Sequence, residues 1–348
     1  MDNVQNINNL RVSIDWLGFT FFAYPSPYDV INYLGFSDAD FSICPGANGY
    51  KSSLRHNTYA VSVLYDGSDN MGIHVNISGS AVSYALECFI DSLKMLTPFG
   101  DYAIEYSDES MMVRYLRHIS ESGKFTRVDL AIDDMGCNYY SVNDMRDICD
   151  SDRCMSRFRS YRPEYERSFN GSITGNTLYI GKRTSDVFLR IYDKRLEQIK
   201  KADTDCGYDW VRWELELKHD RANMAVDYLI SGISLGAVAI GILSNYFRVV
   251  VKCDSNISRC SSEPLWEKFT ENVEKLRLTI SKPEKTLDSK KEWIIKQCMP
   301  SISAIVAYEN GDMSFITNRL SDALWKNKKT ILDKVFSANP NLKEELYS

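Results

Sequence analysis

The sequence contains no C-x-x-C pair, although it has nine cysteines. They are odd in number and scattered, which argues against a disulfide framework or a zinc site and favours a reducing cytoplasm. It also has no apolar run of membrane-spanning length, because its most apolar stretch, Ile233–Leu243, is long enough only for a buried helix. The first residues form neither the basic nor the apolar segment of a secretory signal. We therefore expect a cytoplasmic protein with no membrane partner.

Charge is unevenly distributed along the chain. The formal net charge is −6, from 41 Lys or Arg and 47 Asp or Glu. Arg153–Lys201 nevertheless contains twelve Lys or Arg against five Asp or Glu. A basic segment within an acidic protein is typical of a phosphate-binding surface confined to one side, although a solvated charged face has the same pattern.

A predicted hairpin lies at the centre of this basic segment. Thr177–Gly181 and Val187–Tyr192 have the pattern of two short strands joined by a polar turn. Tyr192 ends the second strand, and the cations in and around the hairpin are Lys182, Arg183, Arg190, Lys194 and Arg195. A tyrosine among fixed cations can attack a phosphodiester, since the cations hold the phosphate and favour loss of the phenol proton. The alternative is a tyrosine that packs at a strand end beside ordinary surface charges.

Two further predicted strands carry paired acids. Asp129 and Asp133 share one face of Phe125–Asp133, and Glu214 and Glu216 share one face of the strand that starts at Val211. If these strands are neighbours, the four carboxylates converge near Tyr192 and require a cation, because like charges at short range repel. Mg²⁺ or Mn²⁺ prefers such hard oxygen ligands. The alternative is a charged strand that faces solvent.

The predicted strand Leu10–Phe22 contributes a fifth acid. Strict alternation assigns its residues to two faces, one with Val12, Ile14 and Trp16 and the other with Ser13, Asp15, Leu17 and Phe19. An unpaired carboxylate within an apolar strand is costly. Asp15 is therefore expected to pair with a cation, to cap a neighbouring element or to bind the same metal ion.

The segment Arg153–Phe169 interleaves arginines with aromatic residues. Its members are Arg157, Arg159 and Arg162 together with Phe158, Tyr161 and Tyr165. Arginines neutralise phosphates while aromatic rings stack on unpaired bases, so the segment is a candidate arm for single-stranded DNA. A charged hairpin arm with no such role has the same composition.

The order of predicted elements indicates an α+β fold. Strands with alternating patterns and a few helices fill residues 1–220, which predicts a largely antiparallel sheet with flanking helices as a catalytic domain. Residues 221–348 predict an all-helical C-terminal domain, with helices at Leu265–Leu276, Thr286–Tyr308 and Met313–Phe336.

Three motifs carry a family resemblance. FTRVDLAID, FLRIYDKRLEQ with Tyr192, and VRWELELKHD resemble the replication initiation factor family (Rep_trans), which contains rolling-circle replication initiators and relaxases of conjugative elements and phages. GIHVNISGSAVSYALE and VSIDWLGFTF are similar to N-terminal elements of the family.

The resemblance implies a site-specific single-strand DNA endonuclease and strand transferase. Tyr192 matches the family nucleophile, which becomes linked to a 5′ phosphate and leaves a 3′-OH for rolling-circle replication or transfer. The resemblance further implies a divalent metal, origin DNA presented as a single strand or cruciform, a host helicase, and a possible homodimer. A helicase partner is needed because the chain has no G-x-x-x-x-G-K-[ST] loop of its own.

Two other functions remain compatible with the residues. One is a non-catalytic DNA-binding replication or regulatory protein, which would keep the basic segment without needing convergent acids. The other is a metal-dependent phosphoesterase in which water attacks and Tyr192 is structural.

Overall fold

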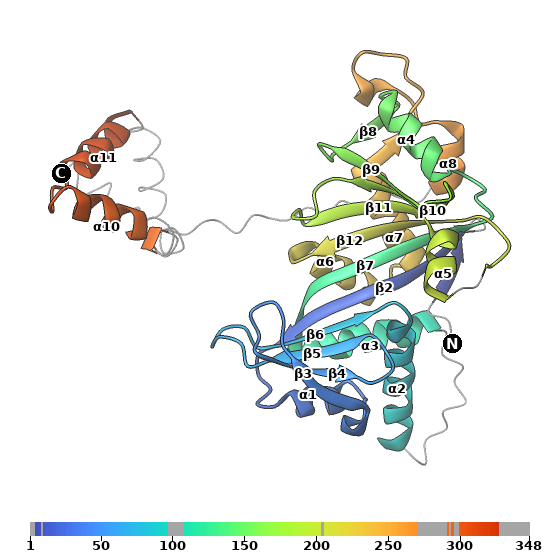
Figure 1. Ribbon diagram of the computed structural model, residues 1–348, viewed down its shortest axis with the longest axis horizontal. Coiled ribbons are helices and arrows are strands. Elements are labelled where there is room, and N and C mark those ends of the chain that lie inside the picture. Colours follow the sequence, from blue (N-terminus) through green and yellow to red (C-terminus); the bar gives the residue numbers. More distant parts are fainter. Residues whose placement is uncertain are drawn as a thin grey trace. The chain divides into compact units, whose positions relative to one another are not determined.

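The computed structural model describes residues 4–7, 10–96, 108–202, 205–270, 291, 294–295 and 299–326. The chain divides into two compact units, Met1–Ile280 and Ser281–Ser348. The first contains the sheet and the second contains α10 and α11 (Figure 1).

One antiparallel sheet of eleven strands forms the first unit, in the order β3-β4-β5-β6-β2-β7-β12-β11-β10-β9, with β1 paired to β2 outside this path (Figure 1). Its strands are β1 (Val4–Ile7), β2 (Leu10–Phe21), β3 (Phe41–Pro45), β4 (Ser52–His56), β5 (Val61–Tyr65), β6 (Ile73–Ser78), β7 (Gly123–Met135), β9 (Tyr161–Arg167), β10 (Ile173–Ile180), β11 (Val187–Asp193) and β12 (Trp210–Lys218). A separate small sheet pairs β8 (Cys154–Ser156) with β13 (Phe247–Val249).

Helices flank the sheet and follow it. In the first unit they are α1 (Pro27–Tyr33), α2 (Ser80–Leu96), α3 (Asp108–Ser122), α4 (Val142–Asp150), α5 (Lys194–Ala202), α6 (Asp220–Ile230), α7 (Leu235–Tyr246) and α8 (Pro264–Thr270), with single 3-10 turns at Asp38–Asp40 and Ile257–Arg259. The second unit contains α10 (Met299–Tyr308) and α11 (Ser314–Lys326). The expected α+β class, a largely antiparallel sheet with flanking helices and helices toward the C-terminus, is confirmed.

The helices α3, α6 and α7 cover one face of the central strands, and α6 and α7 lie behind the sheet in Figure 1. Helix α7 is buried almost all round, as its apolar composition predicts. Helix α6 buries Ala222, Ala225, Val226 and Leu229. This apolar surface is removed from water against the sheet, α3 and the other helix of the pair, so both helices belong to the sheet-containing unit. That unit ends at Ile280 rather than near Asp220, where the sequence placed a domain boundary.

The predicted C-terminal helices are described only in part. The helix expected at Leu265–Leu276 spans Pro264–Thr270, and its later residues lie outside the described part of the chain. The same holds for the beginning of Thr286–Tyr308 and for the end of Met313–Phe336. No helix among the described residues is long and apolar enough to cross a membrane.

A bulge in β2 changes which of its residues share a face. Ile14 pairs with Leu130 of β7, whereas Trp16 pairs with Asp129, so Asp15 is an extra residue in the strand. Beyond the bulge Leu17 enters the core. The expectation that Trp16 shares a face with Val12 and Ile14 is therefore wrong, since strict alternation cannot anticipate an inserted residue.

Candidate active site

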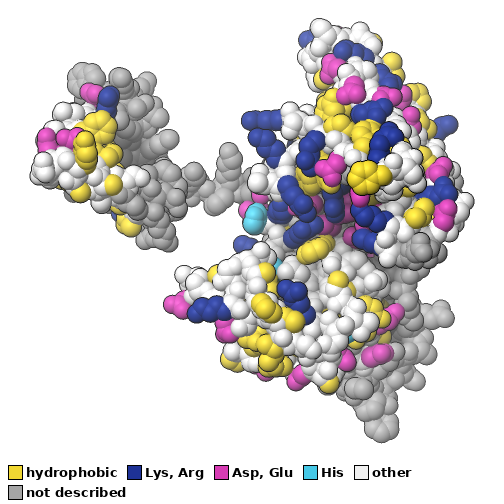
Figure 2. Space-filling model, viewed as in Figure 1, with side chains coloured by type: hydrophobic (Ala, Val, Ile, Leu, Met, Phe, Trp, Pro, Cys, Tyr) yellow, Lys and Arg dark blue, Asp and Glu magenta, His cyan; other side chains and the backbone are white. Residues whose placement is uncertain are grey.

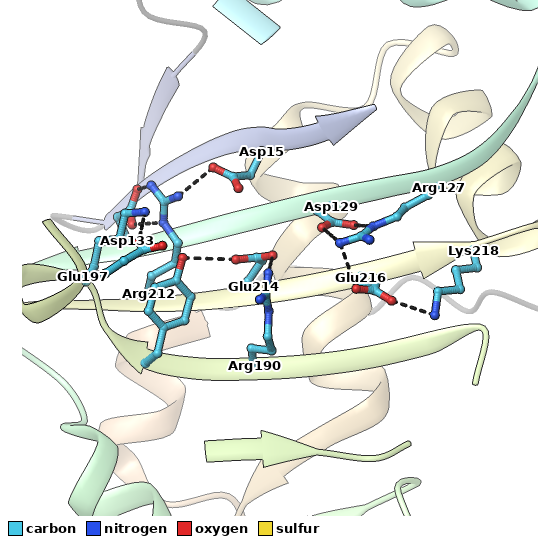
Figure 3. A network of polar contacts seen from close by, with 12 residues as sticks. Asp15, Arg127, Asp129, Asp133, Arg190, Glu197, Arg212, Glu214, Glu216 and Lys218 are labelled. Carbon is cyan, nitrogen blue, oxygen red and sulfur yellow. Dashed lines mark hydrogen bonds and ion pairs between the residues drawn. The ribbon is translucent and has the colours of Figure 1, made fainter. Parts of the chain in front are cut away.

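Three cross-strand rows of side chains form the polar centre of the sheet (Figure 3). The register gives the rows from β11 through β12 to β7 as Tyr192–Arg212–Asp133, Arg190–Glu214–Ala131 and Phe188–Glu216–Asp129. Between these positions, Trp213 packs against Trp266 and Phe269 of α8. Residues that alternate with Trp213 therefore project from the opposite face of the sheet, which we call the Tyr192 face. Figure 2 shows Lys and Arg side chains gathered around acids over these middle strands.

Tyr192 ends β11 in a largely enclosed position. Its hydroxyl donates a hydrogen bond to Oε2 of Glu214 at 3.2 Å. The Nζ of Lys194 lies 5.6 Å from the centre of the ring, and the Arg190 guanidinium lies 5.8 Å from it. Burial raises the pKa of the Tyr192 phenol, the negative charge of Glu214 adds to the rise, and Arg212 opposes it. The neighbouring cations therefore do not offset the burial of the phenol, and proton removal needs an acceptor.

Glu214 occupies the middle of the second row. Its side chain is 1 % exposed, and its Oε1 accepts a hydrogen bond from the Arg190 guanidinium. Its other oxygen accepts from Tyr192. Arg190 therefore fixes the orientation of a carboxylate that is already directed at the phenol proton.

Arg212 joins two of the acids that the sequence assigned to a metal. Its Nε and Nη2 donate to Asp133 at 2.6 and 2.9 Å, and its Nη1 donates to Asp15 at 2.7 Å. Trp210 also donates to Asp133, at 2.7 Å. The β2 bulge directs Asp15 toward this arginine. The ion pair offsets the free-energy cost of placing a carboxylate in an apolar strand. Asp133 and Asp15 thus hold Arg212 beside Tyr192.

Asp129 and Glu216 are opposite each other on β7 and β12, and Arg127 bridges them. Arg127 donates to Asp129 through Nε at 2.8 Å, and its Nη2 lies 2.8 Å from Oε2 of Glu216. Lys218 lies 2.6 Å from the other oxygen of Glu216. Burial raises the pKa of Asp129 to about 7, Arg127 opposes the rise, and Glu214 and Glu216 add to it. The ionised form of Asp129 would therefore be stabilised by further positive charge.

The acids of the Tyr192 face have the donor chemistry of a divalent metal site without forming a closed one. Within the described part of the chain, no three His, Cys, Asp or Glu side chains converge as ligands. Mg²⁺ commonly uses only one or two carboxylates and completes its shell with water and substrate phosphate. Asp129 and Glu216 fit that mode, because the Arg127 guanidinium now supplies the positive charge between them.

Of the predicted phosphate-binding cations around Tyr192, the structure brings two close to it. Arg190 bonds Glu214 (Figure 3), and Lys194 is buried in an ion pair with Glu197. Arg195 points elsewhere, since it pairs with Asp205 and Asp209 at the surface.

The remaining predicted cations lie away from Tyr192. Arg157, Arg159 and Lys182 line a surface pocket of about 350 Å³ at the turn end of the β10–β11 hairpin. Arg183 belongs to the same turn, and its carbonyl accepts a hydrogen bond from Lys218. Because Tyr192 lies five residues along β11 from Val187, this end is roughly 17 Å from it. Arg162 of β9 pairs with Glu164 and lies over the ring of Tyr179.

The tyrosines of the predicted aromatic arm lie on the helical side of the sheet. Tyr161 donates to Asp150 of α4, and Tyr165 bonds Arg146 of the same helix. The ring of Phe158 packs on Tyr246. These rings therefore lie away from the Tyr192 face, because β9 turns them to α4. Both tyrosines are still partly exposed, and the role of this arm in binding single-stranded DNA stays a prediction.

Sequence reasoning missed Arg127, Arg212 and Lys218 as members of the site. The signal was present, since each alternates with the predicted acids on its own strand. An unpaired buried charge is costly, so the predicted acids themselves pointed to cations at the alternating positions.

The fold and this centre define an α+β protein whose antiparallel sheet carries a hydrogen-bonded tyrosine within a ladder of ion pairs on the Tyr192 face. The family model described as replication initiation factor matches residues 123–322. The chain belongs to this family, which confirms the resemblance seen in the sequence.

Two relatives extend the comparison. The chain is 30% identical over 285 residues to "Putative DNA relaxase NicK" of Bacillus subtilis (strain 168), a match that covers 78% of this chain and 75% of the relative. The structure of a rolling circle replication initiator protein from Geobacillus stearothermophilus is similar with a TM-score of 0.62 at 26% identity, over 78% of this chain and 98% of that one.

Proposed function

We propose that this protein is a site-specific DNA nicking and strand-joining enzyme that uses Tyr192 as its nucleophile. The observation that carries the proposal is the hydrogen bond from the Tyr192 hydroxyl to Glu214, whose other oxygen is held by Arg190. A partly buried tyrosine aimed at a fixed carboxylate is the arrangement of a nucleophile with its base. The names of the two relatives, a DNA relaxase and a rolling circle initiator, support the same substrate class.

In the nicking step, the phenol oxygen of Tyr192 attacks a phosphorus of the DNA backbone. The phenol proton passes to Glu214, the bond from oxygen to phosphorus forms, and the bond from phosphorus to the 3′ oxygen breaks. The leaving 3′ oxygen takes up a proton from solvent, so the DNA is left with a free 3′-OH, and the 5′ phosphate is joined to Tyr192. Attack of a 3′-OH on this phosphotyrosyl bond reverses the step, so the strand is rejoined without ATP.

Positive charge around Tyr192 stabilises the transferring phosphoryl group. Arg190, Lys194 and Arg212 surround the phenol, and the latter two are less than a tenth exposed. Cations that are fixed and poorly hydrated stabilise the charge that develops on phosphate oxygens more than mobile surface cations do. Asp133 and Asp15 keep Arg212 in place, which makes them positioning residues in this scheme.

A divalent metal, Mg²⁺ or Mn²⁺, completes the proposal. Asp129 and Glu216 would hold it, and a bound ion would supply Lewis-acid polarisation of a phosphate oxygen. Glu214 is left to accept the proton, while Asp133 and Asp15 are committed to Arg212.

The substrate would be origin DNA, presented at the nick as a single strand or cruciform. A host helicase is a proposed partner because nicking alone does not unwind a duplex, and a homodimer is a further expectation. The resulting 3′-OH would prime rolling-circle replication or transfer of a mobile element.

The test compares wild-type protein with Tyr192→Phe on a labelled single-stranded oligonucleotide library with Mn²⁺, read on a denaturing gel. Tyr161→Phe is the matched control, because it removes a phenol oxygen from the opposite face of the sheet. A covalent protein–DNA band in wild type and Tyr161→Phe, and none in Tyr192→Phe or with EDTA, is expected.

Two other outcomes oppose the proposal. Cleavage that persists in Tyr192→Phe with no covalent band would assign the attack to water. DNA that is retarded but uncut by all three proteins would favour a binding protein without catalysis.

A further inference from the structure

We infer that Tyr179, whose ring contacts Phe188 and Arg162, is a stacking site for one unpaired base beside the phosphate that Tyr192 attacks. This inference rests on the proposed function and adds to it a subsite for a neighbouring nucleotide.

The register places Tyr179 close to Tyr192 on the same face. Thr177 of β10 pairs with Tyr192, and Tyr179 pairs with Arg190. Residues two apart on one strand share a face, so Tyr179 projects beside Arg190. The diagonal between neighbouring strands is about 7–8 Å, which is within reach of aromatic side chains. A nucleotide that places its phosphate at Tyr192 can therefore place an adjoining base at Tyr179.

The two sides of the Tyr179 ring are covered by one buried and one exposed side chain. Phe188 of β11 stacks nearly parallel to it, with ring centres 5.9 Å apart and planes 15° apart. Phe188 is 4 % exposed and is therefore fixed. From β9, on the other side of β10, the Arg162 guanidinium lies 4.9 Å from the ring centre of Tyr179. The Arg162 side chain is 71% exposed, so it can swing away or stack in turn on an incoming base.

These groups have the chemistry that single-stranded nucleic acid requires. Bases stack on aromatic rings and on guanidinium planes, whereas the backbone needs cations. The row that crosses the sheet through Glu214, Arg190, Tyr179 and Arg162 supplies the proton acceptor, a cation and the stacking group in sequence. Tyr161 and Tyr165 of β9, which forms a hairpin with β10, instead bond to α4. Tyr179 is thus the hairpin tyrosine that faces the proposed substrate.

Stacking tolerates every base because each base has an aromatic face. The site should therefore detect whether a base is present at one position next to the nick, without reading which base it is. Removal of that base and removal of the Tyr179 ring should lower the rate of adduct formation by the same factor. Removal of both should lower the rate no further.

The experiment uses the oligonucleotide that forms the covalent band, together with versions abasic at each single position around the nick. Wild type, Tyr179→Leu and Tyr179→Phe are compared, with Tyr161→Leu as a control from the opposite face of the same hairpin. The readout is the rate of adduct formation in a single turnover.

We expect wild type, Tyr179→Phe and Tyr161→Leu each to lose roughly tenfold or more at one abasic position, in line with the stacking contribution of a base. Tyr179→Leu should show that loss with intact DNA and no further loss at that position. If Tyr179→Leu keeps the wild-type sensitivity to the abasic position, the inference is wrong.

Equilibrium binding separates this inference from the proposed chemistry. Fluorescence anisotropy of a mixed-sequence single-stranded oligonucleotide is measured on Tyr192→Phe protein, with and without Tyr179→Leu. Weaker binding with Tyr179→Leu but not with Tyr161→Leu supports the stacking site even if no adduct is ever seen. If Tyr192→Phe protein binds the oligonucleotide equally well with and without Tyr179→Leu, the stacking site is ruled out. This conclusion does not depend on whether nicking is observed.

Discussion

The Tyr192 hydroxyl donates to Oε2 of Glu214 at 3.2 Å, while the second oxygen of Glu214 is held by Arg190. The three residues come from two neighbouring strands and meet through their register. The geometry directs the phenol proton to one carboxylate, even though burial raises the pKa of the phenol.

Glu214→Gln should slow formation of the covalent adduct by about 10²–10⁴-fold, the usual contribution of a general base. The rate that remains should rise with pH by about tenfold per unit, because a phenol with a raised pKa is mostly protonated and solvent must then remove its proton. Single-turnover rates between neutral and alkaline pH provide the measurement. A pH profile that runs parallel to that of wild type would contradict the role of Glu214 as proton acceptor.

Arg190→Gln should lower the rate of the chemical step by roughly 10²–10³-fold, since it removes a fixed cation from the transferring phosphate and frees one oxygen of Glu214. Arg190→Lys should recover part of that loss, because the charge is kept while the geometry of the guanidinium is not. Comparison of the rate at saturating DNA with the affinity for DNA separates this role from simple binding. An effect on affinity alone would make Arg190 a DNA contact only.

Arg212→Met should destabilise the sheet-containing unit by about 3–5 kcal/mol, because Asp133 and Asp15 would remain buried or half-buried without their cation. Urea denaturation followed by tryptophan fluorescence measures the loss. Adding Asp133→Asn to Arg212→Met should restore part of the stability, since the uncompensated charge is then removed. Additive losses in the double variant would indicate that the ion pair does not account for the effect.

Chelation by EDTA should stop adduct formation, and Asp129→Asn or Glu216→Gln should raise the Mn²⁺ concentration needed for half-maximal rate. Asp133→Asn provides the contrast, because its partners are Arg212 and Trp210 and we expect no change in the metal requirement. Titration of Mn²⁺ against the single-turnover rate makes the comparison. An unchanged metal requirement in both Asp129→Asn and Glu216→Gln would remove these acids from the proposed metal site.

Much of the framework could be predicted from local pattern. The β10–β11 hairpin, the acid-bearing strands β7 and β12, and the buried helix α7 follow from periodicities of two residues or from continuous apolar sequence. The α+β class follows from the same reading. These elements are determined by residues that are close together along the chain, so the sequence alone is enough to predict them.

The faces of β2 and β9 could not be predicted in the same way. The bulge at Asp15 shifts the alternation of side chains along β2. The residue types at this position do not predict a bulge. On β9, alternation separates Tyr161 and Tyr165 from Arg162, but only the packing of the two tyrosines against α4 shows which of these side chains lie on the Tyr192 face. The helices α6 and α7 join the sheet unit for a similar reason, since burial of their apolar faces depends on strands far away in the sequence.

The sequence by itself therefore determined which strands carry the tyrosine, the acids and the cations, because side-chain alternation is a local property of an extended chain. The tertiary structure decided which of them meet. The antiparallel register of β7, β12 and β11 sets Tyr192 against Arg212 and Arg190 against Glu214, and it gives each buried acid of the Tyr192 face a cation from its own or a neighbouring strand. Register is fixed by the burial of the opposite face against α7 and α8, and a shift of one residue would turn the whole polar centre into the core.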